Sequence, residues 1–470
     1  MGNISSLILQ NSAHRDIIKT AGDIADRTNM NAYLVGGYVR DCLLHRENYD
    51  IDIVVEGDGK VFALELSKAL GIGTVVDYSR FGTSVIPHPE IEIEIATARK
   101  ESYTPESRKP NVEFCSIEDD ISRRDFTINA IAASIRSSDF GTLLDPYKGI
   151  QDLQKGIIIT PLDPDITFSD DPLRILRAIR FASQLNFNIT SNVLDSIYRT
   201  RDRLSIISWE RIRDEIIKAL RSDKPSIAFY LMKETRVLSY VFPELDIMSG
   251  VETIDGKGHK DVFIHTLQVV DNAASLSDKM EVRFAALVHD IAKPQTKRYY
   301  PDKGWTFHGH EEIGRRMMHD TAKRLKLPND LRDYLKKLIK LHLRPIALAK
   351  EGVTDTAIRR IMNEAGDDID DLMTLCRADI TTKNPKKVKK YIKNFDRVEE
   401  LMNDVKLRDE MKKFQSPVSG KEIMKLFKLT EGPEIGRIKK LIENKILDGI
   451  LPNDYDSVLS FIKENKQDII

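Results

Sequence analysis

Two aspartates two positions apart, Asp50 and Asp52, stand in an apolar run that is typical of a β-strand. Side chains two apart on a strand share a face, so both carboxylates point one way while the residues between them face the core. Magnesium prefers carboxylate oxygens together with substrate phosphates, and two such ions can clamp the attacking and leaving oxygens of a phosphoryl transfer. The pair therefore predicts a magnesium site for phosphoryl-transfer chemistry.

A glycine pair, Gly36 and Gly37, precedes these aspartates, between a short apolar run and a helix expected to open near Val39. Residues without a Cβ let backbone N–H groups approach a triphosphate, and Arg40 adds a charged fork that suits phosphate oxygens. Residues 33–56 thus predict a strand, a glycine turn, a helix and a second strand around a nucleotide. The structural alternative is an ordinary strand-turn-helix unit with a surface acidic strand.

A second group of charged side chains recurs at every third position of a predicted helix: Asp171, Arg174, Arg177 and Arg180. We expect Ser169 or Asp170 to cap this helix, with Pro172 in its first turn. Steps of three residues rotate by about 300°, so the four side chains form a slowly drifting stripe. An Asp and an Arg one turn apart could bind the Watson–Crick edge of a base, and further arginines suit phosphates. A solvated helix face is the alternative.

A third group lies in apolar, helix-like runs near the middle of the chain: His265, His289, Asp290, His342 and Asp379. Imidazole and carboxylate together suit divalent metals of intermediate hardness, and a metal-bound water is a nucleophile for phosphoesters. His308 and His310 lie nearby in the sequence. Each histidine alone is more simply a core or surface residue, whereas the set of five predicts a metal site.

Mixed strand and helix signals up to about residue 150 predict one α/β part, and helical patterns dominate beyond it. Residues 13–30 have helical spacing, and strict alternation from Ile91 predicts a half-buried strand with an acidic face. Residues 102–114 are polar with two prolines and predict a mobile loop. Residues 143–158 predict a turn.

Arg123 and Arg124 precede a predicted helix in which Asp125 is the N-cap, and they would stand within reach of a phosphate or ribose. The lysine-rich residues 381–413 predict a solvated helix pair, which is also the best local candidate for a phosphate-backbone surface. The following 35 or so residues predict two helices joined by a turn at Gly432-Pro433, and this module could grip a nucleic-acid backbone or simply pack.

The composition narrows the class of protein. The chain has 470 residues, 31% charged and 41% hydrophobic, which fits about three helix-rich domains. Since 72 basic side chains balance 73 acidic ones, a nucleic acid would have to bind a local basic surface. Three separated cysteines argue against a disulfide framework and favour the cytoplasm. No run of 18 apolar residues occurs, so we expect no membrane partner.

Five segments, in order, resemble the motifs of the bacterial-type, class II tRNA nucleotidyltransferase and poly(A) polymerase family within the polymerase-β-like superfamily. They are LVGGYVRD with YDIDIVV, RRDFTINA, LLDPYKGIQDL, DDPLRILRAIRF and SWERIRDEI, and SGKEIM with EGPEIGRIKK resembles the family's tail. The resemblance implies an α+β protein whose nucleotidyltransferase head, a mixed sheet with helices, precedes all-α neck, HD and tail domains. The ranges that we expect are 1–150, 151–245, 246–400 and 401–470.

This resemblance also implies roles for particular residues. Asp50 and Asp52 would hold two Mg²⁺ ions, and Glu94 is preferred over Glu92 as a third carboxylate. Asp171 and Arg174 would form the protein template that pairs with an incoming cytosine or adenine. Tyr49 departs from the family, which has a small or basic residue there. The implied nucleotide-binding residues are Gly36, Gly37, Arg40, Arg124, Asp171, Arg174, Arg177 and Arg180.

The middle domain is similar to HD-type phosphohydrolases, and their ligand pattern falls on His265, His289, Asp290 and Asp379. The similarity implies a further divalent metal there. It also implies that the domain could remove phosphates or open cyclic phosphates at RNA ends.

We therefore expect template-independent addition of CCA to tRNA 3′ ends from CTP and ATP. A poly(A) polymerase, or an enzyme that adds only CC or only A, shares the same motifs; the full-length segment 102–114 favours complete CCA addition. Two alternatives come from other classes: a metal phosphohydrolase with the head as nucleotide sensor, and a non-catalytic tRNA-binding module. The Asp50–Asp52 pair argues against the last. The sequence leaves the oligomeric state and the metal of the HD domain open.

Overall fold

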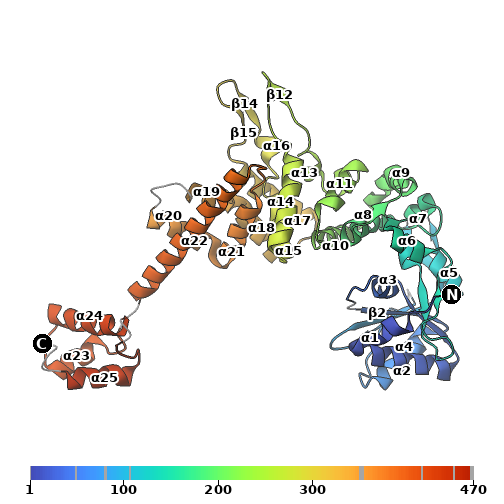
Figure 1. The fold of residues 1–470 in the computed structure, drawn as a ribbon, viewed down its shortest axis with the longest axis horizontal. Helices are drawn as coiled ribbons and strands as arrows, with labels where there is room; N and C mark the ends of the chain where they lie inside the picture. The colour runs from blue at the N-terminus through green and yellow to red at the C-terminus, as the bar shows by residue number, and fades with distance from the viewer. Residues whose placement is uncertain are drawn as a thin grey trace. The chain divides into compact units, whose positions relative to one another are not determined.

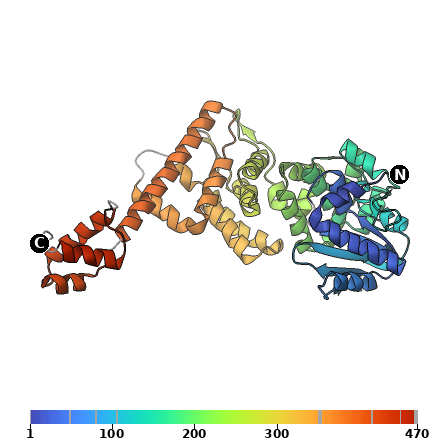
Figure 2. The same cartoon turned by 60° about the horizontal axis from the view of Figure 1, so that its bottom comes forward.

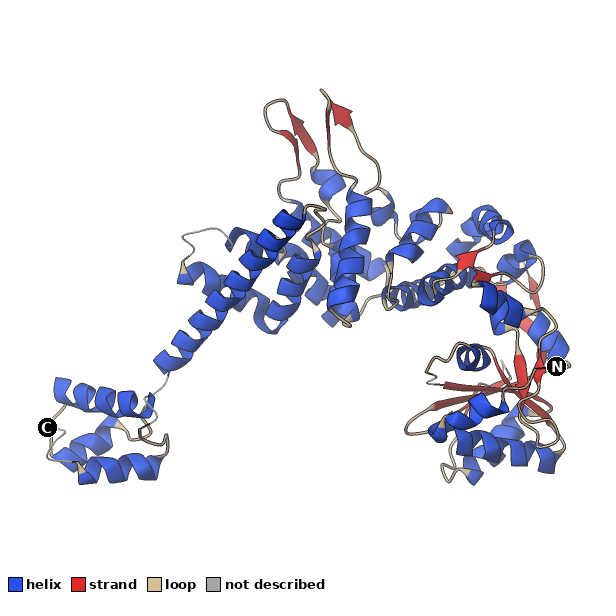
Figure 3. Cartoon of the chain, viewed as in Figure 1, coloured by secondary structure: helices blue, strands red, loops and turns tan. Residues whose placement is uncertain are grey.

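A computed structural model describes residues 2–47, 50–78, 82–104, 107–348, 354–413, 416–447 and 450–465; Tyr49 lies outside them. Its contacts divide the chain into two compact units, Met1–Leu343 with Asp367–Lys383 and Arg344–Gly366 with Asn384–Ile470. Strands gather in the N-terminal part of the first unit and helices predominate elsewhere (Figure 3). The predicted α+β class is confirmed. Within the described ranges, no helix has both the length and the apolar composition that a membrane crossing requires.

A seven-stranded mixed sheet forms the centre of the N-terminal part (Figure 1). Its strands are hydrogen-bonded in the order β3-β4-β5-β2-β1-β8-β9. Its strands are β1 (Asn31–Val35), β2 (Asp50–Glu56), β3 (Val76–Tyr78), β4 (Thr83–Pro87), β5 (Glu92–Thr97), β8 (Ala132–Ser134) and β9 (Leu143–Leu144). Strand β2 runs antiparallel to β1 and parallel to β5, with Asp52 opposite Glu94. Since partners in register project from the same face, this pairing brings carboxylates from two strands together.

Alternation along β2 separates the core from the acidic residues. Ile51, Ile53 and Val55 are at most 1% exposed, while helices α2 and α4 pack on one another and against the sheet (Figure 1). The predicted helix over 13–30, the strand-turn-helix-strand unit over 33–56 and the alternating strand after Ile91 are all confirmed. The helices of this part are α1 (Ser5–Gln10), α2 (Ser12–Thr28), α3 (Gly37–Leu43), α4 (Gly59–Ala69), α5 (Ile117–Ser122) and α6 (Gly149–Lys155).

The loop predicted over 102–114 is wrong for the residues that the structure describes. Strands β6 (Arg99–Thr104) and β7 (Ser107–Phe114) pair antiparallel, with Lys100 opposite Glu113. Each strand of a two-stranded ribbon is an edge strand, and edge strands are where a sheet tolerates a proline. Backbone pairing therefore orders a segment whose polar composition favours a loop.

The helix predicted after Asp125 is also wrong. Only a short 3₁₀ turn, η2 (Thr127–Asn129), forms before the chain enters β8, which pairs with β1. The Asp125 carboxylate does accept the N–H of Phe126, at 2.9 Å. The apolar stripe that follows serves as a buried sheet strand, because the edge of β1 is available for pairing.

The turn predicted over 143–158 contains more structure than expected: β9, helix α6 and β10 (Ile157–Ile158). The Asp145 carboxylate accepts the N–H groups of Gly149 and Ile150, at 2.6 and 3.0 Å. A side-chain acceptor at that place satisfies the otherwise unpaired N–H groups of a helix start. This short helix is too brief for an apolar period to reveal it.

The segment after β10 is helical. It comprises α7 (Pro164–Asp170), α8 (Leu173–Leu185), β11 (Asn188–Ile189), α9 (Ser191–Thr200), η3 (Arg201–Ile206), α10 (Trp209–Leu220), α11 (Ser226–Glu234), α12 (Leu238–Val241) and α13 (Pro243–Asp246). The predicted cap is wrong: Ser169 and Asp170 end α7, and Pro172 is the N-cap of α8. The Asp171 carboxylate accepts the N–H of Leu173 instead, at 3.2 Å.

Arg180 of α8 is a buried cation that α10 neutralises. Its guanidinium donates to Glu215, at 2.6 Å, and lies over the Phe181 ring, 4.0 Å from the centroid. We expect Glu215→Leu to lower the free energy of unfolding by about 3 kcal/mol, because Arg180 would stay buried without its partner. Urea denaturation measures this.

The exposed pair of Asp165 and Arg199 provides the control for that measurement. Breaking it with Asp165→Ala should cost less than about 1 kcal/mol, since solvent screens exposed pairs. Equal costs for the two substitutions would contradict a stabilising role for the buried pair.

The remaining elements of the first unit surround a helical bundle. They are β12 (Thr253–Ile254), β13 (Lys257–Gly258), α14 (Val262–Leu276), α15 (Met280–Val288), α16 (Lys293–Thr296), β14 (Arg298–Tyr300), β15 (Gly304–Thr306), α17 (His310–Arg324), α18 (Asn329–Leu341) and α21 (Ile369–Ala378). Helix α15 packs against α14, α18 and α21. The ends of these helices carry the histidines and aspartates of the third predicted group.

The second unit is helical: α19 (Arg344–Leu348), α20 (Asp355–Ala365), α22 (Pro385–Lys413), α23 (Gly420–Phe427), α24 (Pro433–Leu447) and α25 (Tyr455–Glu464). The predicted lysine-rich helix pair is wrong, since α22 is one continuous helix (Figure 2). No glycine or proline follows Pro385 within it, so nothing breaks the helix. The two helices predicted around Gly432-Pro433 are confirmed, and α25 completes their apolar core.

Candidate active site

Three carboxylates from two strands gather at the head. Asp50 and Asp52 lie on β2, and Glu94 lies beside Asp52 on β5. Burial, followed by repulsion from Asp50 and Glu94, raises the pKa of the Asp52 carboxyl to about 7. Burial likewise raises the pKa of Glu94. Mutual repulsion of this kind is relieved by a cation, so the residues present fit a divalent metal.

The glycine turn approaches these carboxylates closely. Gly36 is the N-cap of α3 and has a φ of 64°, a conformation that favours glycine. A Cβ on Gly36 would lie 3.1 Å from Nη1 of Arg124 and 3.7 Å from Oδ2 of Asp52. A Cβ on Gly37 would lie 3.7 Å from Nη2 of Arg40. The turn therefore leaves open the space between the carboxylates and two arginines.

Both arginines are held by carboxylates of their own. Arg124 pairs with the buried Asp120, at 3.0 Å, and Arg40 pairs with Asp41, at 2.7 Å. Arg123 also pairs with Asp120. Because their rotamers are fixed before any ligand binds, Arg40 and Arg124 are preorganised cations beside the glycine turn.

A polar chain connects the head to helix α8. Arg40 donates to the Asn129 side chain, at 2.8 Å, and Asn129 donates to Asp125, at 3.0 Å. Asp125 pairs in turn with Arg177 of α8, at 2.7 Å. Burial raises the pKa of Asp125, but Arg177 and the Asn129 amide outweigh it and hold the pKa at about 2. The carboxylate is thus ionised at neutral pH.

Phe181 provides a second connection. The guanidinium groups of Arg40 and Arg177 lie 5.0 and 5.4 Å from the centre of its ring. The sequence predicted only a helix cap for Asp125 and did not single out Asn129. A pattern that could have identified Asp125 and Asn129 is that both are polar residues among the apolar neighbours of the segment RRDFTINA. Both are buried in the structure.

The four charged residues of DDPLRILRAIR therefore differ in surroundings. Asp171 precedes α8 and Arg174 lies in its first turn, where its charge also lowers the pKa of Asp125. Arg177 belongs to the series of polar contacts that reaches Arg40 of the head through Asp125 and Asn129. Arg180 instead donates to Glu215 and Gln184, each at 2.6 Å. Of these four residues, Arg174 and Arg177 are thus coupled electrostatically to Asp125 and through it to the head.

The third predicted group forms a second centre. His265 Nε2 lies 3.0 Å from Asp379 and 3.5 Å from Asp290, and His289 Nε2 lies 3.1 Å from Asp290. Burial lowers the pKa of His265, but hydrogen bonds with Asp290 and Asp379 outweigh it and raise the pKa to about 9. His265, His289 and Asp379 present ligand atoms within 4.8 Å of one another. These residues fit a divalent metal of intermediate hardness.

Helix ends position this centre. His289, His342 and Asp379 are the C-caps of α15, α18 and α21. The partial negative charge of a helix C-terminus favours a cation. His310, which sequence reasoning named without assigning, lies 3.3 Å from both Asp290 and His342, whereas His308 is exposed.

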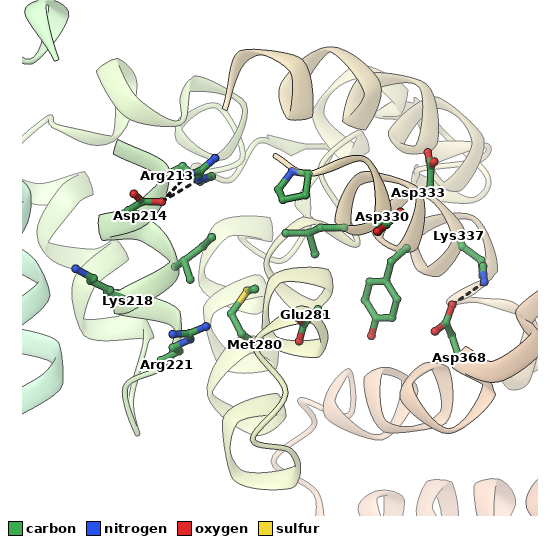
Figure 4. A pocket seen from close by; sticks show the side chains of 14 residues that line it. Arg213, Asp214, Lys218, Arg221, Met280, Glu281, Asp330, Asp333, Lys337 and Asp368 are labelled. Atoms are coloured by element: carbon green, nitrogen blue, oxygen red, sulfur yellow. Dashed lines mark hydrogen bonds and ion pairs between the residues drawn. The ribbon is translucent and has the colours of Figure 1, made fainter. Parts of the chain in front are cut away.

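A separate cleft of about 900 Å³ opens beside α10, α15 and α18 (Figure 4). It mixes cations such as Arg213, Lys218 and Arg221 with carboxylates such as Asp330 and Asp333. None of the site residues discussed above lines it. Because five carboxylates outnumber four cations among its lining residues, the cleft has no electrostatic preference for a polyanion.

Three family models match three consecutive parts of the chain. Residues 32–159 match the poly A polymerase head domain, residues 186–248 the probable RNA and SrmB-binding site of polymerase A, and residues 262–399 the HD domain. The fold and the two centres thus define the class: a nucleotidyltransferase of the poly(A) polymerase-head type that carries an HD domain.

Similar proteins specify the family. The "multifunctional CCA protein" of Shewanella frigidimarina is 37% identical over 319 residues, 65% of this chain and 72% of that protein. This chain belongs to the family of CCA-adding tRNA nucleotidyltransferases.

Solved structures have the same fold. A tRNA nucleotidyltransferase complexed with a primer tRNA and an incoming ATP analog is 26% identical, with a TM-score of 0.57 over 81% of this chain and 99% of that chain. An apo CCA-adding enzyme is 24% identical, with a TM-score of 0.59 over 98% of both chains. Membership of this family, together with the polymerase head, implies that the head depends on a divalent metal.

Proposed function

We propose that this protein adds CCA to tRNA 3′ ends from CTP and ATP. One observation carries the proposal: Asp50, Asp52 and Glu94 converge in register on the same sheet face, next to the Gly36 turn. Membership of the CCA-adding family supplies the substrate class. The product is a tRNA that ends in three added nucleotides.

In this proposal Asp50 and Asp52 hold two Mg²⁺ ions, with Glu94 as the third carboxylate. When bound, the ions lower the pKa of the tRNA 3′ hydroxyl and neutralise charge on the transferred phosphate. The backbone N–H groups of the Gly36-Gly37 turn donate to triphosphate oxygens, and Arg40 and Arg124 add positive charge. These residues act by orientation and charge, so their fixed geometry is the main contribution of the chain.

Incubation of a tRNA transcript that lacks CCA with CTP and ATP, followed by sequencing of the ends, tests the proposal. Ends that carry CCA and nothing beyond it support it. Tails of adenosine indicate a poly(A) polymerase, and ends that stop at CC or need a pre-existing CC indicate partial addition. A chain that binds the transcript without extending it would be a binding module only.

Asp171 and Arg174 are proposed to select the base, with Arg177 of the same helix providing positive charge toward phosphates. Arg180, which the resemblance implies as a further phosphate contact, is instead buried and paired with Glu215. We expect Asp171→Ala to lower the preference for CTP and ATP over UTP and GTP by about 10-fold or more, since a bidentate base contact is worth about 1–3 kcal/mol of discrimination. Single-turnover incorporation of each nucleotide measures this. Asp195→Ala, on α9, is the control; unchanged selectivity of Asp171→Ala would refute the template role.

A second activity is proposed for the HD domain. His265, His289, Asp290 and Asp379 would hold a divalent metal, and the buried His289 Nε2 and Asp290 Oδ1 have no hydrogen-bond partner among the described residues. A buried polar atom without a hydrogen-bond partner is one mark of a ligand that binds there. The substrate that fits is a phosphate ester at an RNA end, hydrolysed by water.

We further propose the functional division 1–150 for the head, 151–245 for the neck, 246–400 for the HD domain and 401–470 for a tRNA-binding tail. At the end of the proposed HD domain, before the tail, helix α22 begins with exposed lysines, among them Lys386, Lys387 and Lys390, which suit a phosphate backbone. We propose that CCA addition takes place in the cytoplasm. All three cysteines are among the described residues and none forms a disulfide, which is typical of a reducing compartment.

A further inference from the structure

Two β-hairpins of the HD domain carry aromatic side chains beside its cluster of histidines and aspartates. The hairpins are β12–β13 and β14–β15, and both extend from the helical bundle (Figure 1). We propose that their aromatic side chains form a stacking surface for the bases at the 3′ end of an RNA chain. This inference rests on the proposed phosphoesterase function of the HD domain and deepens it, because it assigns the part of the substrate that the domain recognises.

Polar contacts hold the two hairpins together. Tyr299 donates its hydroxyl to Asp255, at 3.0 Å, and Lys297 pairs with Glu252, at 2.6 Å. Among the residues of the four strands whose burial is described, only Gly304 is buried. Since a two-stranded hairpin has no core of its own, the aromatic side chains of these hairpins lie at a surface.

Four half-buried rings form a row along this surface, in the order Phe307, His259, Trp305 and Tyr299. The centroids of neighbouring rings are 6.0, 5.2 and 5.3 Å apart, and the ring planes are tilted by 86°, 79° and 61°. Proteins that bind single-stranded nucleic acids stack successive bases on partly exposed aromatic side chains arranged in this way.

His259 is oriented by both of its ring nitrogens. Nδ1 donates to the carbonyl of Lys260, at 2.8 Å, because a carbonyl can only accept. Nε2 accepts the backbone N–H of Glu252, at 3.2 Å, so the imidazole is the neutral tautomer. With both nitrogens bonded to its own hairpin, the ring offers a ligand its π surface.

Two lysines lie against the row of rings. Lys297 Nζ is 5.5 Å from the centre of the Trp305 ring, and Lys293 Nζ is 5.7 Å from the centre of the Phe307 ring. The segment 297–308 has more basic than acidic side chains. Cations that attract the phosphate backbone, combined with rings that stack on bases, are the features by which proteins bind single strands. The charge and the rings together therefore favour RNA as the occupant.

The row begins at the HD centre. The carbonyl of Phe307 accepts a hydrogen bond from Nδ1 of His310, at 2.7 Å, and His310 Nε2 lies 3.3 Å from Asp290. Lys293 connects the same places, since its Nζ is 2.5 Å from Asp290 Oδ2. A phosphate bound at the HD centre thus has its own nucleoside beside Phe307, and the preceding bases extend toward Trp305.

The substrate class is a single-stranded RNA end with a terminal phosphate, held by its bases as well as by that phosphate. Hydrolysis joins the oxygen of one water to phosphorus and breaks the P–O bond to the ribose. One proton of that water goes to the departing 3′ oxygen, and the other is released. The products are inorganic phosphate and an RNA end with a free 3′ hydroxyl.

Tryptophan fluorescence tests the stacking without reference to catalysis. The chain has two tryptophans, Trp209 and Trp305, so Trp209→Phe leaves Trp305 as the reporter. This full-length parent is titrated with a short single-stranded RNA that ends in a 3′-phosphate, and with the same RNA made without bases. We expect the base-bearing RNA to quench the Trp305 emission and to bind about 10-fold or more tightly than the abasic RNA.

Neighbouring tyrosines supply a matched contrast. Tyr299 lies opposite Trp305 in the β14–β15 register, whereas Tyr300 lies opposite Gly304, and adjacent residues of a strand face opposite ways. In the Trp209→Phe parent, Tyr299→Leu should reduce the preference for base-bearing over abasic RNA by about 5-fold or more. Tyr300→Leu should leave that preference unchanged. Circular dichroism checks that both variants fold.

Phosphate release from the same two RNAs, with Mn²⁺ present, connects the surface to the HD centre. In the unmodified protein, the KM of the base-bearing RNA should be about 10-fold or more below that of the abasic RNA. Trp305→Leu should close this gap, and Trp305→Phe, which keeps a flat ring, should restore most of it. A purely structural role for Trp305 would instead change both KM values alike.

The result identifies which proposal fails. Equal affinity for base-bearing and abasic RNA, or equal effects of Tyr299→Leu and Tyr300→Leu, overturns the stacking surface. Phosphate release without a preference for bases also overturns it, and leaves the proposed hydrolytic function in place. Quenching and base preference without any phosphate release support the stacking surface and overturn the hydrolytic function.

Discussion

Asp52→Asn should lower the rate of nucleotide incorporation by about 1,000-fold or more, because one carboxylate of the metal-binding set is lost while the shape of the site is kept. Primer extension on a tRNA that lacks CCA, under single-turnover conditions, measures this loss. Circular dichroism should be unchanged. Turnover retained within about 10-fold would be incompatible with metal-dependent transfer at this residue.

The neighbouring glutamates give matched controls for Asp52. Glu94→Gln should also cause a large loss, since Glu94 lies opposite Asp52, whereas Glu92 lies opposite Asp50 and is exposed. Glu92→Gln should therefore keep incorporation within a few-fold of the unmodified protein. The reverse order would assign the third carboxylate to Glu92.

The raised pKa of Asp52 predicts a pH dependence of stability in the metal-free protein. The pKa of Asp52 is about 7 in the folded protein, above that of an Asp in the unfolded chain. The stabilisation that protonated Asp52 contributes is therefore fully present below the pKa of the unfolded group, and it is lost as the pH rises through 7. Asn carries no charge at any pH. Asp52→Asn should thus raise the melting temperature most at about pH 8 and less at about pH 5. An equal shift at both values would contradict a buried, repelled carboxylate.

The second large effect is expected at the other centre. Asp290→Asn should lower hydrolysis of a phosphate at an RNA end by about 1,000-fold or more, because the carboxylate that all four histidines face is lost. Nucleotide incorporation should stay within about two-fold, since the head carries its own metal-binding set. Phosphate release and primer extension on the same preparation measure both.

Asp278→Asn provides the matched control for Asp290. Asp278 is fully exposed and lies in the loop before α15, the helix that His289 caps. Both activities should survive that substitution. Loss of incorporation in Asp290→Asn would indicate a folding defect in the shared unit, and retained phosphate release would locate the hydrolytic site elsewhere.

Much of the head is determined by local pattern. Period-two alternation correctly places Asp50, Asp52 and Glu94 on strands, because a strand turns successive side chains to opposite faces whatever its neighbours are. The Gly36-Gly37 turn is likewise predictable, since its conformation depends on backbone sterics alone. The order of the five motifs then points to the family.

The errors arise where pairing partners are distant in sequence. Residues 102–114 lack an apolar period, yet backbone hydrogen bonds across β6 and β7 order them. The run after Asp125 has a helical period but becomes a strand, because β1, about a hundred residues earlier, offers an open edge. Local propensity is a weak determinant whenever a sheet edge is available.

The sequence by itself determined the chemistry at each centre: carboxylates and a glycine turn at the head, and imidazoles with carboxylates in the HD domain. Only the tertiary structure decided which residues meet. It set Glu94 rather than Glu92 beside Asp52, joined Arg40 to Arg177 through Asn129 and Asp125, and added His310 to Asp290. The reason is that residue type and spacing fix what a side chain can bind, whereas register and helix packing fix which side chains lie within a few ångströms of one another.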